Sequence, residues 1–102
     1  MLLVEQNQNN YYLSFGNIHK FNVNNAQTVE NELMEYIDKP SASVTLNMKE
    51  VAFIDSTAFE ALLNVLRKAK INNTSFQLGS VSEEAMDLIK LMQLDKVFTF
   101  KN

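Results

Sequence analysis

Three oxygen-bearing side chains stand together where one apolar segment ends and another begins. Asp55, Ser56 and Thr57 directly follow the apolar pair Phe53 and Ile54, and the chain then turns apolar again. Ser, Thr and Asp are preferred at helix starts, because their side-chain oxygens accept hydrogen bonds from backbone amides of the first turn. The positive end of a helix also favours an anion such as phosphate. The triplet therefore has two interpretations, a purely structural helix start and a phosphate-accepting site at Ser56.

A capping box is predicted at the start of the following helix. Thr57 is the expected N-cap, and the Glu60 side chain is expected to reach back to the Thr57 backbone amide. Ser56 would then lie just outside the helix, beside Asp55, with its hydroxyl not consumed by capping. This arrangement favours Ser56 as the group that accepts a phosphate.

The sequence lacks the residue combinations that are typical of catalytic sites. A serine nucleophile needs a base and an oxyanion hole, and the only histidine, His19, has no visible triad partner. The two glycines, Gly16 and Gly79, are too few for a phosphate-binding loop or a dinucleotide-binding fingerprint. No His, Cys and carboxylate residues have metal-site spacing. We therefore expect no enzyme activity, no cofactor and no metal.

Composition is typical of a single globular domain. The chain has 102 residues, of which 46% are hydrophobic, and this is enough for a core. It has no cysteine, a net charge of -3 and no long basic face, so we expect neither disulfides nor direct nucleic-acid binding. No apolar run approaches the roughly 20 residues of a membrane span, and no signal peptide is recognisable. We predict one cytoplasmic domain over residues 1–102, without membrane insertion.

Hydrophobic periodicity predicts alternating strands and helices. Strands are expected in the segments LLVEQ, YYLSFG, SVTLNM, SFQLGS and KVFTF. Helices are expected from Asn24 or Asn25 to Ile37, from Ala58 to Ile71, and after a cap at Ser82, with an inward stripe of Ala85, Leu88, Ile89 and Met92. The order β-β-α-β-α-β-α-β indicates an α/β domain with a mixed, partly parallel sheet packed against helices.

The segments SVTLNMKEVAFIDSTAFEALLNVLRKAK and SFQLGSVSEEAMDLIKLMQLDKVFTF resemble the STAS domain family, and within it the bacterial anti-sigma factor antagonists. The shared pattern is a strand, a short apolar stretch, and an Asp-Ser-Ser/Thr triplet that opens a helix. A later serine-capped helix and a final Leu-Asp-x-Val-Phe complete it. The resemblance is clear over residues 42–100 and extends to the N-terminal part by the order of elements. It implies a single STAS-like domain.

The resemblance also implies a phosphorylation cycle. In the family, an anti-sigma factor kinase phosphorylates the serine directly after the aspartate, and these two residues correspond to Ser56 and Asp55. The unphosphorylated form binds the anti-sigma factor, and a phosphatase resets the phosphorylated form. The implied partners are an anti-sigma factor serine kinase and a PP2C-type phosphatase, in a role in transcription regulation. The free chain is expected to be a monomer.

Departures from the family pattern keep a second function open. Ala58 replaces the usual glycine, Phe59 replaces the leucine after it, and His19 stands where an acidic residue usually follows the second strand. Some family members are not phosphorylated and serve as scaffolds or as subunits of lipid-transport ABC complexes. A non-phosphorylated STAS subunit is therefore the alternative to the phosphorylation switch.

A partner docked over Ser56 would need an apolar anchor close to that side chain. Phe59 and Leu63 follow within two helical turns, and we expect one of them to be partly exposed. Together with Glu60 they form the candidate partner-binding residues.

Overall fold

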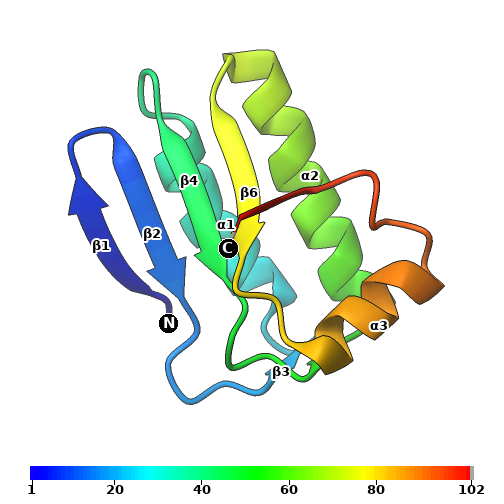
Figure 1. Ribbon diagram of the computed structural model, residues 1–102. Helices are drawn as coiled ribbons and strands as arrows, with labels where there is room; N and C mark the ends of the chain where they lie inside the picture. Colours follow the sequence, from blue (N-terminus) through cyan, green and yellow to red (C-terminus); the bar gives the residue numbers. More distant parts are fainter. Residues whose placement is uncertain (102) are drawn as a thin grey trace.

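In the computed structural model, which describes residues 1–101, a five-stranded sheet is backed by two helices (Figure 1). Its strands are β1 (Leu3–Asn7), β2 (Asn10–Ser14), β4 (Ser43–Asn47), β6 (Ser75–Gly79) and β7 (Thr99–Lys101), in the order β1-β2-β4-β6-β7. β1 and β2 are antiparallel, and all other neighbours are parallel. The prediction of a mixed, partly parallel sheet in an α/β domain is confirmed.

The three predicted helices are present, with small shifts at their ends. They are α1 (Ala26–Ile37), α2 (Ser56–Asn72) and α3 (Glu83–Leu91). α2 ends before Asn73, whose left-handed conformation (φ 55°) is the expected helix stop. α3 begins after Ser82, whose hydroxyl accepts the predicted capping hydrogen bond from the Ala85 backbone N–H at 3.1 Å.

The core lies between the sheet and the pair α1 and α2, which Figure 1 shows behind the strands. α1 buries residues at helical spacing, and β4 turns Val44 and Leu46 toward them. The inward residues of α2 are Ala58, Phe59, Ala61, Leu62, Val65, Leu66 and Ala69. On α3, Ala85 and Ile89 are buried as predicted, but Met92 is exposed, because the helix ends one residue before it.

Two short strands, which the hydrophobic pattern did not predict, form a separate parallel pair. They are β3 (Lys20–Phe21) and β5 (Phe53–Ile54). Two residues are too few to show a strand period, so this pairing depends on tertiary contacts. It joins the segment before α1 to the segment before α2, and the backbone amide of Asp55 continues it by donating to the Phe21 carbonyl at 3.2 Å. The pair therefore holds the start of α2 in place.

Candidate functional site

Asp55, rather than Thr57, is the N-cap of α2. Its Oδ1 accepts a hydrogen bond from the Ala58 backbone N–H at 2.9 Å, and its Oδ2 accepts one from the Val23 backbone N–H at 2.9 Å. A carboxylate can accept both bonds at once, whereas a threonine hydroxyl has one oxygen. The predicted capping box is wrong for this reason, and the helix begins earlier than its apolar pattern predicted.

Glu60 is correspondingly free of the capping role that the sequence predicted for it. Its side chain is exposed, and its Oε1 lies 3.6 Å from Arg67 Nη1 in a surface ion pair. Two such exposed partners are well solvated, so the pair adds little to stability. Glu60 therefore contributes charge to the surface near Ser56 and does not fix the helix start.

Ser56 is the first residue of α2 and is exposed to solvent, so it lies inside the helix rather than just before it. Within residues 1–101, its hydroxyl makes no hydrogen bond, because Asp55 performs the capping. The Ser56 hydroxyl is therefore accessible, as a phosphate acceptor must be. Asp55 itself is half-buried, and Thr57 is exposed.

Phe59 lies in the core, with 4% of its surface exposed, so its predicted role as an exposed anchor is wrong. Leu63 is half-buried and packs at the edge of the core, which confirms the partial exposure expected of one of the two. Ala58 is fully buried. Its methyl group, at the position where the resemblance implies a glycine, therefore packs inward.

Two exposed apolar residues near Ser56 were missed by the sequence analysis. Phe53 is 44% exposed and Val23 is 64% exposed. Phe53 precedes buried Ile54 in β5, and alternation along a strand turns one of the two outward when the other is inward. That signal was present in the sequence. The position of Val23 was not, because the pairing of β3 with β5 brings its backbone N–H to Asp55.

Thr57 and Glu60 also line a groove of about 340 Å³ between α1 and α2. Its other lining residues are Val23, Ala26, Gln27, Glu30, Ala61 and Asn64. The Asn64 side-chain amide donates to Glu30 Oε1 at 3.2 Å across the groove. The surface beside Ser56 is therefore hollowed and carries acidic groups from both helices.

His19 is exposed and forms hydrogen bonds with the backbone of the segment before β5. Its Nδ1 lies 3.0 Å from the Glu50 carbonyl oxygen, and its own carbonyl accepts from the Ala52 N–H at 2.9 Å. Across residues 1–101, no cluster of three or more His, Cys, Asp or Glu side chains is arranged to bind a metal ion. In the same part of the chain, none of the helices combines the length and the apolar character needed to cross a membrane.

Asp55→Ala is expected to lower the free energy of unfolding by about 0.5–2 kcal/mol, through loss of the helix cap. Urea denaturation of the two proteins measures the difference. Thr57→Ala is the matched control and should stay within about 0.5 kcal/mol of wild type, as an exposed side chain without a capping bond. A larger loss of unfolding free energy in Thr57→Ala than in Asp55→Ala would show that Thr57, and not Asp55, caps the helix.

The sequence model of the STAS domain matches residues 4–102. The chain belongs to the STAS domain family.

Similar solved structures include several anti-sigma factor antagonists. A STAS domain protein from Planctomyces limnophilus, described as an anti-sigma factor antagonist, superposes with a TM-score of 0.86 at 17% identity, covering 97% of this chain and 87% of that one. One from Mycobacterium paratuberculosis gives 0.79 at 22%, covering 98% and 83%. Unphosphorylated SpoIIAA, a Bacillus protein, gives 0.78 at 10%, covering 100% and 89%. At these identities the likeness establishes the fold.

Proposed function

We propose that this chain is a phosphorylation-controlled interaction switch of the anti-sigma factor antagonist type. Unphosphorylated, it binds an anti-sigma factor serine kinase; phosphorylation of Ser56 releases it, and a PP2C-type phosphatase restores it. The observation that carries the proposal is the exposed Ser56 hydroxyl at the first position of α2, which has no hydrogen-bond partner among the described residues. SpoIIAA, which shares the fold, has been solved in unphosphorylated and phosphorylated forms. The proposed cycle is cytoplasmic, acts on transcription through the partner, and leaves a monomer when the partner dissociates.

The start of α2 can accept a phosphate without a change of fold. Phosphorylation adds about -1.5 to -2 charges at pH 7, and a helix N-terminus favours an anion by roughly 0.3–1 kcal/mol. The first turn, residues 56–59, contains no acidic residue, while Asp55 and Glu60 on either side repel the added charge. Attraction and repulsion are of similar size for solvated groups. The phosphate therefore acts on a partner rather than on the domain.

The proposed partner surface runs from Ser56 along one stripe of α2. Ser56, Glu60 and Leu63 recur at helical spacing, and Leu63 offers partly exposed apolar area. Phe53 and Val23 supply further exposed apolar side chains before the two helices begin. An apolar surface around a switchable group suits a partner that must be released by a change of charge.

Incubation with candidate anti-sigma factor kinases and ATP, followed by intact-mass measurement, tests the proposal. Wild type is expected to gain one phosphate, and Ser56→Ala none. Thr57→Ala is the matched control and should still be phosphorylated, because its hydroxyl is adjacent but not the acceptor. Modification that persists in Ser56→Ala would contradict the assignment. Partner binding without any phosphorylation would favour the non-phosphorylated STAS subunit.

A further inference from the structure

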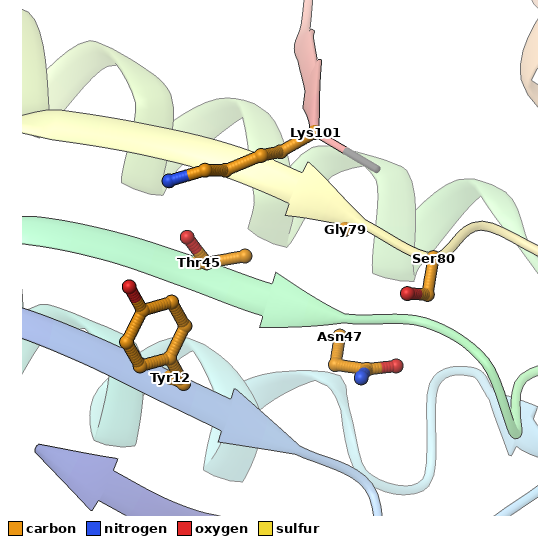
Figure 2. A pocket seen from close by; sticks show the side chains of 6 residues that line it. All are labelled: Tyr12, Thr45, Asn47, Gly79, Ser80 and Lys101. Carbon is orange, nitrogen blue, oxygen red and sulfur yellow. The ribbon is translucent and has the colours of Figure 1, made fainter.

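A polar hollow lies on the sheet face that α1 and α2 leave uncovered. The two faces are distinguished by neighbouring tyrosines of β2. The Tyr11 ring packs 5.1 Å from the Tyr36 ring of α1, so Tyr12 points to the opposite face. The hollow has a volume of about 160 Å³ and is lined by Tyr12, Thr45, Asn47, Gly79, Ser80 and Lys101 (Figure 2). It is separate from the surface around Ser56.

Gly79 opens the floor of this hollow. A Cβ added there would lie 3.0 Å from Thr45 Cγ2, closer than side chains normally pack. Within residues 1–101, no glycine has a positive φ, so the backbone conformation does not require glycine at this position. The missing side chain therefore leaves space between β4 and β7 on the open face.

Two of the lining side chains already accept a hydrogen bond from a neighbouring residue, which leaves their own donor groups available to a ligand. Thr45 Oγ1 accepts a hydrogen bond from Gln77 Nε2 at 2.6 Å, so its own O–H is available to donate. Asn47 Oδ1 accepts from the Lys49 backbone N–H at 2.8 Å, so its NH₂ group is available in the same way. Gln77 is itself buried, with 7% exposed, and holds Thr45 firmly.

The charge of the lining is positive. Lys101 reaches from β7 across β6, and Tyr12 points its hydroxyl from the other side, so that both lean toward Thr45 (Figure 2). Among the described residues, no carboxylate lines the hollow. Glu5 pairs with Tyr12 in the β1–β2 register, so it lies on the same face and lines the adjoining hollow, which shares Tyr12 and Asn47.

We propose that this hollow binds a phosphate group, held by the Lys101 ammonium and by the Tyr12 and Thr45 hydroxyls, with Asn47 and Ser80 lining its other end. An ammonium on the same side of the hollow as the Tyr12 and Thr45 hydroxyls is complementary to an oxyanion, and Asn47 and Ser80 line the other end (Figure 2). The volume of the hollow is below the roughly 300–1,000 Å³ of sites for drug-sized ligands, so the bound group is small. Its source is either free inorganic phosphate or a small phosphomonoester.

Amide chemical shifts of the full chain, recorded while inorganic phosphate is titrated at constant ionic strength, test the proposal. Saturable changes are expected at Thr45, Asn47, Gly79 and Ser80. Lys101→Gln should weaken the affinity about tenfold or more, since a hydrogen bond to a charged group contributes at least one such factor. Lys90→Gln, which removes the same charge from α3, is the matched control and should leave the affinity unchanged.

Further ligands assign the source and complete the test. Tighter binding of glycerol 3-phosphate than of inorganic phosphate supports a phosphomonoester ligand, and the reverse order supports the free ion. Acetate, which has fewer acceptor oxygens, should bind more weakly than either, and equal binding would overturn the phosphate assignment. Absence of saturation, equal affinity in Lys101→Gln, or changes confined to the start of α2 would each overturn the site. None of these results depends on phosphorylation of Ser56.

Discussion

Ser56→Glu is expected to weaken binding of the kinase partner strongly, while Ser56→Ala preserves it. A partner docked over the start of α2 must remove water from the introduced carboxylate, at a cost of several kcal/mol unless it supplies a cation. Phosphate carries more charge than the carboxylate, so the effect of Ser56→Glu is a lower limit for phosphorylation. Affinities of both variants for the purified partner, measured by calorimetry, give the difference directly.

A matched control separates local charge from overall charge. Thr28 is exposed on α1, and Thr28→Glu adds the same charge to a different helix. It should bind the partner as wild type does. All three variants should melt close to wild type, because the substitutions are at exposed positions. Equal partner affinity for Ser56→Glu and Ser56→Ala would refute the switch and favour the non-phosphorylated subunit.

Phe59→Ala is expected to lower the free energy of unfolding by about 3–5 kcal/mol, the usual cost of removing a buried phenylalanine side chain. Phe59 is 4% exposed and packs with the inward face of α2. The loss should appear in urea denaturation as a lower midpoint with an unchanged slope, because the fold itself is kept. Such a loss is a large part of the stability of a domain of this size.

Phe53→Ala provides the matched control for Phe59→Ala. It removes the same side chain from a position that is 44% exposed, so its cost should be well below that of Phe59→Ala. Similar losses for the two variants would mean that β5 depends on Phe53 as the core depends on Phe59. A negligible loss for Phe59→Ala would contradict its burial and restore it as a surface anchor.

Long periodic segments determined most of the fold from the sequence alone. The apolar residues of α1 and α2 recur at helical spacing over 12 and 17 residues, which is enough to identify a helix without its neighbours. Ser82 and Asn73 have strong local preferences for a helix start and a helix end, and both act as predicted. The alternation of these elements along the chain implied the parallel sheet, and the DST triplet identified Ser56 as the candidate acceptor.

Only the tertiary structure decided which residue of the triplet caps α2. Asp55 and Thr57 are both competent N-caps, and local sequence does not choose between them. The pairing of β3 with β5 makes Asp55 the cap, because it brings the Val23 amide to Asp55 Oδ2 and the Phe21 carbonyl to the Asp55 amide. These partners are more than 30 residues away in sequence. Asp55 is thereby fixed at the cap, and the Ser56 hydroxyl makes no hydrogen bond to any of residues 1–101.

The burial of Phe59 and the phosphate-sized hollow were also decided by tertiary contacts. The apolar face of α2 is wide, and Phe59 and Leu63 are both apolar residues of this helix. Packing against α1 and the sheet determines which of them is covered. The hollow is lined by residues of β2, β4, β6 and β7 and by Ser80 just after β6, and their spacing in the sequence does not group them. Lateral strand order and register bring them together, and both are set by packing between segments far apart in the chain.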